Sequence, residues 1–250
     1  YNLFTNGAFS ITRGFEVSLR TKRIGGVMGM VNYSLSDAKG TNSDPSGQVA
    51  AIEAGAPTPS QIQPLEFQQR HTGSVVLDYS SGSDNPVWAQ NWSANVLFRF
   101  SSGHPYTLST GGFGQRSADD GPLLTNDDPR NRSPLTSINA ATTPFTTQTD
   151  LRLSRGFDLG VAEAKAYISV ENLFNQRNVV NVYRRTGSAT SDGFLSNPQL
   201  SGDLVEANGQ RYVDYYQAVN LDNARHYRED AGQDLFGTPR EIRIGFEVTY

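Results

Sequence analysis

The chain has 250 residues, a formal net charge of −4 and no cysteine. This charge balance gives no basic footprint for nucleic acid, and the lack of cysteine excludes a disulfide framework and a thiolate metal site. No apolar run approaches the roughly 20 residues that a transmembrane helix needs. The mean hydropathy of −0.49 is compatible with a transmembrane β-barrel, because a barrel spreads its apolar residues in alternation.

The N-terminal segment YNLFTNGAFSITRGFEVSL (1–19) has no initiator Met, no charged n-region and no apolar h-region. A secretory signal peptide would show these features. The segment instead enters a strand pattern almost at once. We therefore expect the chain to be cut from within a longer protein.

Apolar residues recur at every second position in seven segments, with polar residues between them. A period of two predicts a β-strand with one apolar and one polar face. Tyr167 is an exception that falls on a polar side. A helical period is suggested only at 215–229, where we expect a short helix within a loop. The predicted strands lie within 9–19, 31–36, 74–79, 91–100, 151–159, 164–174 and 240–250.

Short and long connections alternate between these segments. RIGG (23–26), SSGSDNP (80–86) and GVAE (160–163) are turn-like. The other three connections are long and rich in Gly, Pro, Asn, Asp and Ser. Long structureless loops are uncommon in compact soluble domains, whereas outer-membrane barrels combine short periplasmic turns with long extracellular loops. The sequence therefore predicts an all-β fold, a transmembrane antiparallel β-barrel, whose last strand ends at the periplasmic rim.

Several motifs resemble TonB-dependent outer-membrane receptors. VENLFNQRN (170–178), followed by a long loop and GTPREIRIGFEVTY (237–250), is similar to the C-terminal end of that family. PLEFQQRHTGSVVLDY (64–79) and FSSGHPYT (100–107) are similar to earlier family segments. The motifs keep the family's order and cover nearly the whole chain. GFEVSL and DLRLSRGF are similar to the Oar-like branch, which carries a carboxypeptidase-regulatory-like module.

The resemblance implies that residues 1–250 form the C-terminal portion of a barrel of about 22 strands. Such a receptor lies in the outer membrane of a Gram-negative cell and binds an extracellular ligand. Energy from the TonB complex, acting through an N-terminal plug, then drives uptake. The plug and the earlier strands would lie outside this chain. The implied partners are outer-membrane lipid, the ligand, the TonB complex and the barrel assembly machinery, with neither a cofactor nor an enzymatic activity.

The last strand would also carry the outer-membrane assembly signal. Its apolar residues alternate up to an aromatic residue at the interfacial girdle. Barrels of this kind present such a pattern to the insertion machinery. The signal residues are Ile242, Ile244, Phe246, Val248 and Tyr250.

The last long loop, from Asn175 to about Thr238, is the predicted ligand-facing element. Tyr and Arg are frequent in recognition surfaces because they combine a large contact area with polar tips. The alternative is that these residues pack the loop onto its neighbours. The candidates are Tyr183, Arg184, Arg185, Tyr212, Tyr215, Tyr216 and Tyr227.

Metal and catalytic motifs are weak in this sequence. His71, His104 and His226 are far apart, and no metal site is predicted. The acidic loop 118–132 carries oxygen ligands that calcium prefers, but it lacks the EF-hand spacing, which favours a solvated loop. GGFGQR (111–116) lacks the closing glycine of a dinucleotide fingerprint. No nucleophile elbow, P-loop or zincin motif is present, and no enzyme is predicted.

Four residues bear on the membrane interface. Trp88 and Trp92 are expected in the periplasmic girdle and not in a ligand-stacking platform. Arg13 and Arg155 fall on the apolar register of their strands. Either a bulge at the following glycine shifts the register, or the two side chains reach toward lipid head-groups.

Two other classes of protein remain as alternatives. One is a passive or translocator barrel, such as the end of an autotransporter, although the long loops disfavour it. The other is a secreted β-sandwich that acts as a binding module or a glycan-active enzyme. A sandwich would bury its apolar faces and dissolve without detergent.

Overall fold

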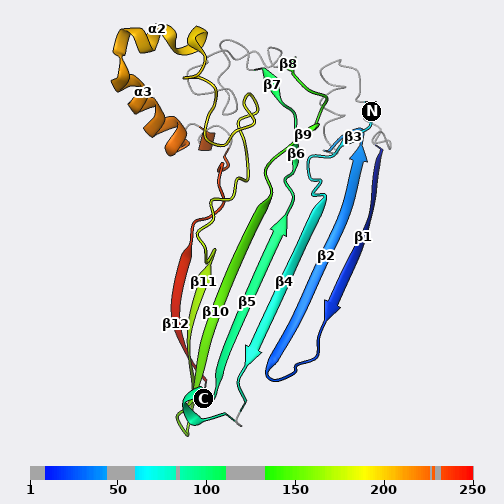
Figure 1. The fold of residues 1–250 in the computed structure, drawn as a ribbon, viewed down its shortest axis with the longest axis vertical. Coiled ribbons are helices and arrows are strands. Elements are labelled where there is room, and N and C mark those ends of the chain that lie inside the picture. The colour runs from blue at the N-terminus through cyan, green and yellow to red at the C-terminus, as the bar shows by residue number, and fades with distance from the viewer. Residues whose placement is uncertain are drawn as a thin grey trace, which may run out of the picture.

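The computed structural model describes residues 9–43, 60–82, 85–110, 133–225, 227–228 and 232–249. One large antiparallel sheet dominates the described chain, and seven long strands follow one another across it in chain order (Figure 1). The seven predicted strands and their antiparallel pairing are confirmed. They are β1 (Ser10–Arg20), β2 (Val27–Gly40), β4 (His71–Ser80), β5 (Trp92–Ser101), β10 (Thr146–Asp158), β11 (Glu163–Glu171) and β12 (Glu241–Thr249).

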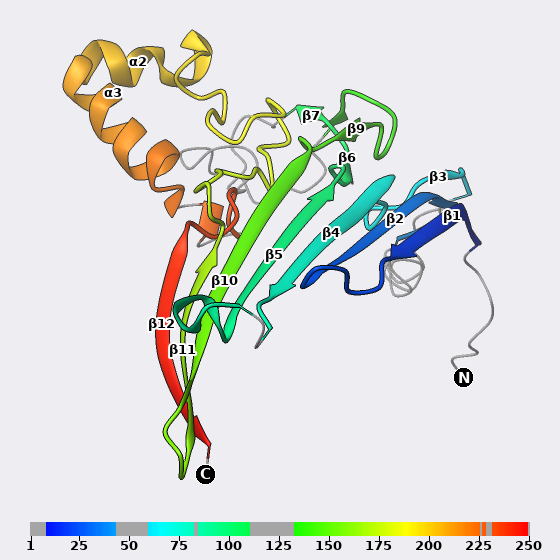
Figure 2. The ribbon, with the colours of Figure 1, turned by 60° about the horizontal axis from the view of Figure 1, so that its bottom comes forward.

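The sheet is twisted and stays open within the described residues. The strands β1 and β12 lie at opposite edges (Figure 2), and in the described part of the chain no strand pairs with the outer edge of either. The short strand β3 (Gln63–Pro64) adds two residues to β2. A closed barrel is therefore not seen in this chain.

Short and long connections lie at opposite ends of the sheet. The short connections 21–26, 81–91 and 159–162 join β1 to β2, β4 to β5 and β10 to β11. The second of them contains a single 3₁₀ turn, η1 (Val87–Ala89). The long connections 41–70, 102–145 and 172–240 all leave from the other end. We call these the turn end and the loop end of the sheet.

The pairing register gathers the apolar residues on one face. Leu77 lies opposite Val96, which lies opposite Leu151, and the row continues through Val170 to Ile242. Residues directly opposite each other in an antiparallel pair point to the same side of the sheet. One unbroken apolar row therefore crosses five strands.

The opposite face carries the polar residues. Tyr167 lies on this face as predicted, opposite Ser154 and Gly245. Gly245 leaves room for this ring, because a Cβ built there would lie 2.3 Å from Tyr167 Cζ. The Tyr167–Gly245 pair therefore fixes the register of β11 against β12.

The bulges considered at Gly14 and Gly156 are absent, so that explanation of Arg13 and Arg155 is wrong. The β1–β2 pairing runs without interruption from Ser10 to Arg20. The β10–β11 pairing likewise passes through Gly156 without an extra residue. Both arginines belong to the apolar face.

Short strands and helices lie in the loop-end connections. Two-residue strands pair as β6 (Pro105–Tyr106) with β9 (Ala141–Thr142) and β7 (Ser109–Thr110) with β8 (Ser133–Pro134). The helices α2 (Pro198–Asn208) and α3 (Gln210–Tyr216) and the π-helical segment η3 (Gln217–Asp222) lie above β12 (Figure 1). No helix in the described ranges is both long and apolar enough to cross a membrane.

Helical structure is confirmed within the expected segment 215–229, at 215–222, 225 and 227–228. The expected start is wrong, because helical structure already begins at Pro198. The Asn197 side chain accepts a hydrogen bond from Gln199 N at 3.0 Å. An Asn cap followed by Pro at the first helical position is a recognised helix start. The Asn-Pro pair was therefore the signal that predicts α2.

Candidate functional site

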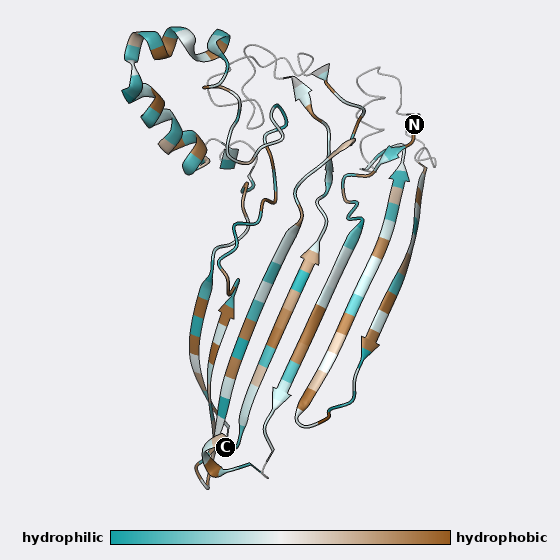
Figure 3. Ribbon diagram, in the orientation of Figure 1, coloured by the Kyte–Doolittle hydropathy of each residue, from teal (hydrophilic) through white to brown (hydrophobic). Residues whose placement is uncertain are grey.

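The apolar face of the sheet is exposed along the seven strands. Apolar and polar residues alternate along each strand (Figure 3), and Leu19, Ile244 and Phe246 expose 64%, 79% and 62% of their surface. Monomeric soluble proteins rarely expose apolar patches larger than a few hundred Å². A face of this extent is typical of a surface that contacts a membrane or another protein.

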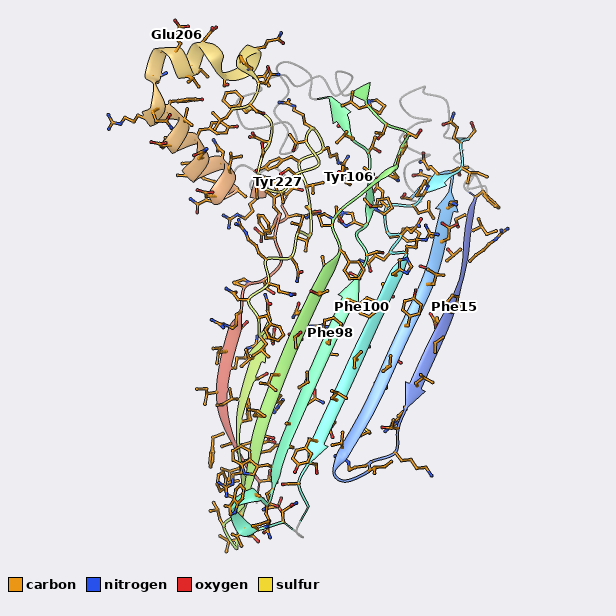
Figure 4. The ribbon with its side chains drawn as sticks, in the orientation of Figure 1. Phe15, Phe98, Phe100, Tyr106, Glu206 and Tyr227 are labelled. Atoms are coloured by element: carbon orange, nitrogen blue, oxygen red, sulfur yellow. The ribbon has the colours of Figure 1, made fainter. Side chains whose placement is uncertain are left out.

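Aromatic rings form one belt on this face near the loop end. The Tyr33 ring lies 5.9 Å from Phe15 and 6.4 Å from Phe100, between ring centroids. Phe98 and Phe145 extend the belt at 6.0 and 5.9 Å from Phe100. Figure 4 shows Phe15, Phe98 and Phe100 at a similar height on β1 and β5. We call these five residues the upper aromatic belt.

A second aromatic group lies at the turn end of the same face. The Arg155 guanidinium lies 5.4 Å from the Trp92 ring and 5.3 Å from the Phe157 ring. Trp92 Nε1 donates a hydrogen bond to Trp88 O at 3.1 Å, and Trp88 is exposed. Trp, Tyr and Arg side chains with this arrangement are typical of a membrane–water interface.

The spacing between the two aromatic groups matches a bilayer. Trp92 and Phe100 are eight residues apart on β5, which is about 26 Å along a strand. A barrel tilt of about 40° reduces this to about 20 Å, close to the apolar band of about 25 Å on outer-membrane barrels. Ala94 and Val96 lie between them on the same face.

Hydrogen bonds between side chains cross the polar face. Ser18 Oγ donates to Asn32 Oδ1 at 2.8 Å, and Asn32 Nδ2 donates to Ser74 Oγ at 3.3 Å. Arg99 Nη2 donates to Asp150 Oδ2 at 2.6 Å. These contacts link β1 to β4 through Asn32 of β2, and they link β5 to β10.

A cavity of about 970 Å³ lies over the polar face near the loop end. Asn178, Val180 and Thr238 of the last long connection border it. The cavity is therefore an open hollow bordered by the sheet and by a loop. Its sheet wall includes Ser18, Asn32, Ser74, Ser101, Thr146 and Gln148.

Asparagine side chains attach this last connection to the sheet. Asn178 Nδ2 donates to Thr147 O at 2.7 Å, and Asn178 Oδ1 accepts from Thr147 N at 3.1 Å. Asn175 Oδ1 accepts from Arg240 N at 3.0 Å. The connection thus has a fixed base.

Three of the predicted ligand-facing residues are buried inside the loop. Tyr183 and Tyr227 pack edge to face at 5.4 Å between centroids, in a cluster with Ala189, Ala224 and Leu235. Tyr216 is 1% exposed. The alternative interpretation, that such residues pack the loop, describes these three tyrosines.

The remaining candidates are more accessible but do not form one site. Arg184 and Tyr215 are exposed, and Arg185 and Tyr212 are partly buried. Arg184 lines a small cavity, whereas Tyr215 lies on α3. Ligand contact by these four residues stays a prediction.

Asp192 organises the loop and was not predicted. Its carboxylate is 1% exposed, and it accepts hydrogen bonds from Tyr216 Oη at 2.5 Å and from Phe194 N at 2.9 Å. The Phe194 and Tyr216 rings stack at 4.6 Å. Burial raises the pKa of Asp192 above its ordinary value, although these hydrogen bonds and the nearby Arg185 act in the opposite direction.

His104 lies in a polar cavity of about 350 Å³ where the three long connections meet. Glu66 and Arg184 line the same cavity. Burial lowers the pKa of His104, the Glu66 carboxylate raises it and Arg184 lowers it. The net shift is downward, which favours a neutral imidazole at neutral pH.

The described residues contain no group of three or more metal-ligating side chains. His71 Nδ1 lies 2.8 Å from the Tyr33 hydroxyl, on the apolar face. His226, GGFGQR (111–116) and the acidic loop 118–132, with Asp119, Asp120, Asp127 and Asp128, lie outside the described residues.

The predicted assembly-signal residues share the apolar face of β12. Ile242, Ile244, Phe246 and Val248 lie opposite apolar residues of β11 and are exposed. Tyr250 lies outside the described residues.

No protein-family model matches the chain, and no curated protein or solved structure matches it. Function is therefore inferred from the surfaces described above.

Proposed function

We propose that the chain is the C-terminal part of the β-barrel of a TonB-dependent outer-membrane receptor. The barrel binds an extracellular ligand at the loop end and passes it through the lumen when the plug is remodelled. No covalent chemistry is involved. The seven strands contribute one wall of a barrel whose other strands pair with the outer edges of β1 and β12.

The observation that carries this proposal is the exposed apolar face between two aromatic groups. The residues of this face come from seven strands that pair in one register. The distance between the two aromatic groups suits the hydrocarbon layer of a membrane. The opposite face, with Asn32, Arg99 and Asp150, supports a polar lumen. The receptor assignment adds the motif resemblance to these features.

The loop end supports the ligand-binding part of the proposal. The 172–240 connection has an ordered core around Tyr183 and Leu235, and a cavity lies between its base and the polar face. Exposed residues such as Arg184 and Tyr215 are then the candidates for ligand contact. The long connections disfavour a passive or translocator barrel.

Labelling of single cysteines in intact cells tests this topology. These 250 residues contain no cysteine, and any cysteine elsewhere in the complete protein is first replaced by serine. Tyr215→Cys places a thiol on an exposed position of α3, and Val161→Cys places one in a short turn; these side chains are 67% and 92% exposed. A membrane-impermeant maleimide should label Tyr215→Cys in intact cells. It should label Val161→Cys only after the outer membrane is permeabilised.

Equal labelling of both variants in intact cells would contradict the proposal. Release of the protein by osmotic shock, without detergent, would instead support the secreted β-sandwich. A sandwich would also leave both thiols accessible after release.

A further inference from the structure

Three basic residues lie at the loop end of the sheet near Asp37. Arg13 lies opposite Asp37 in the β1–β2 register, and Lys39 follows two residues later on the same face. Lys39 Nζ lies 2.9 Å from Asp37 Oδ2, and Arg70 acts electrostatically on the same carboxylate. All three basic residues are exposed. We call these four residues the rim cluster.

The rim cluster lies directly beyond the upper aromatic belt. Arg13 is two residues from Phe15 on the same face of β1, which is about 7 Å along the strand. The next ring of the belt, Tyr33, contacts His71 through its hydroxyl. Along β1 the face thus changes from aliphatic at Val17 to aromatic at Phe15 and basic at Arg13, and Ile11 follows opposite Lys39.

The charge of the cluster is unusual for this protein. The chain carries a formal net charge of −4, whereas this cluster combines three basic residues with one carboxylate. Lys39 and Arg70 act directly on that carboxylate, and Arg13 lies opposite it in the register. Basic residues at a membrane surface attract anionic head-groups, and their long side chains can reach the head-group layer from an apolar position. A soluble anion would need the basic residues but would make no use of the aromatic belt beneath them.

We propose that the rim cluster binds the phosphate of an anionic membrane lipid, with the lipid's acyl chains lying on the upper aromatic belt. This inference rests on the proposed function, because it takes the apolar face to be in contact with lipid. Arg13, Lys39 and Arg70 supply the donors for the phosphate oxygens. Asp37 limits the attraction by neutralising part of their charge.

Lipid binding to the detergent-solubilised protein tests the inference. The probes are phosphatidylglycerol, phosphatidylcholine and inorganic phosphate, and affinity is measured by native mass spectrometry and by titration calorimetry. Each basic residue near an anionic surface is worth about fivefold in affinity. The triple variant Arg13→Gln, Lys39→Gln, Arg70→Gln should therefore bind phosphatidylglycerol at least tenfold more weakly, and Asp37→Asn should bind it more tightly.

A matched control removes three exposed basic residues at the turn end, with Arg20→Gln, Lys22→Gln and Lys165→Gln. This control should leave phosphatidylglycerol affinity within twofold of the natural protein. An equal loss in both triple variants would overturn the inference, because only overall charge would then matter. Binding of inorganic phosphate as tight as that of phosphatidylglycerol would also overturn it.

Failure of the proposed function and failure of the lipid site give different results. A folded monomer that needs no detergent would contradict the proposed function itself. A detergent-folded protein whose lipid affinity is unchanged in the rim-cluster variant would contradict only the lipid site.

Discussion

The side chain of Asn172 joins the two ends of the last long connection. Asn172 Nδ2 donates to Gln176 O at 2.9 Å and to Thr238 O at 3.0 Å, although Thr238 is 66 residues away in the chain. Asn172 Oδ1 accepts from Gln176 N at 2.8 Å. The first Asn of the Asn-Leu-Phe-Asn motif therefore closes the base of the loop.

Asn172 also connects the loop to the polar face. Its backbone N–H donates to Asp150 Oδ1 at 2.9 Å, and Asp150 accepts from Arg99 and Gln148. A buried side chain that satisfies two carbonyls and one N–H is difficult to replace. The polar face of the sheet and the loop base thus share one hydrogen-bond network.

We expect Asn172→Gly to loosen the whole connection. Glycine keeps the positive φ of 52° at this position but removes three hydrogen bonds, and each buried group left unpaired costs about 1–3 kcal/mol. Hydrogen exchange and limited proteolysis between 176 and 238 should both become faster. Asn181→Ala, which removes one exposed bond to Asp234 O, is the control and should change little.

Arginine substitutions should distinguish the two faces of the sheet. Val96→Arg or Ile168→Arg places a charge on the proposed lipid face near the middle of a strand and should cost about 2–4 kcal/mol in the complete barrel. Asn95→Arg, on the polar face beside Asp78, should cost much less. Ser169→Arg, which faces the same side, should also be milder. Refolding titrations into lipid vesicles measure these costs, and equal values for both faces would exclude a lipid-facing sheet.

The buried Asp192 predicts that the loop becomes more stable in acid. A carboxyl whose pKa is raised in the folded state stabilises that state most below the unfolded pKa, near 3.8. This contribution is lost as the pH rises through the folded pKa. Hydrogen exchange at 183–222, corrected for intrinsic rates, should slow as the pH falls from 7 toward 4.

Asp192→Asn is the control for this pH effect. The amide cannot ionise, so the pH dependence should disappear. Its single oxygen can replace only one of the two carboxylate oxygens that accept from Tyr216 Oη and Phe194 N, so exchange should be faster by the same factor at every pH. An unchanged pH dependence in Asp192→Asn would assign the effect to another group.

Loss of the last aromatic residues should impair assembly. We expect the double variant Phe246→Ser, Tyr250→Ser to lower the amount of protein in the outer membrane and to leave material in the periplasm for degradation. The paired control Glu247→Ser, Thr249→Ser alters the polar face of the same strand and should be mild. Normal insertion of the first variant in cell fractionation would show that these aromatics are not the signal.

The strands were predictable because the alternation of apolar and polar residues is visible within a single strand and needs no knowledge of its neighbours. Each strand of the sheet exposes its apolar face, so its apolar residues had to alternate, as they do from Trp92 to Phe100. The alternation also predicted that Leu77, Val96 and Leu151 face the same side of their strands. Their direct pairing across the sheet was not predicted, because a shift by two residues would keep the same faces. Arg155 was ambiguous in the sequence because its aromatic partners lie on its own strand and on β5.

The loop was less predictable because its packing is not periodic. Tyr183 and Tyr216 look like recognition residues in the sequence, yet the former packs on Tyr227 and the latter donates to Asp192. Such long-range pairings leave no local pattern. The helix start at Asn197 was the exception, because a cap and a following proline are local signals.

The most direct test of the membrane-facing sheet is a cysteine scan of β5 with spin labels, in the complete protein reconstituted in lipid vesicles. These 250 residues contain no cysteine, and any cysteine elsewhere in the complete protein is first replaced by serine. Labels at Ala94→Cys, Val96→Cys and Phe98→Cys should be accessible to oxygen and protected from a water-soluble nickel chelate. Labels at Ser93→Cys and Asn95→Cys should show the reverse, giving a period of two. Two results would contradict a membrane-facing sheet. In the first, the nickel chelate reaches all five labels equally; in the second, neither oxygen nor the chelate reaches any of them.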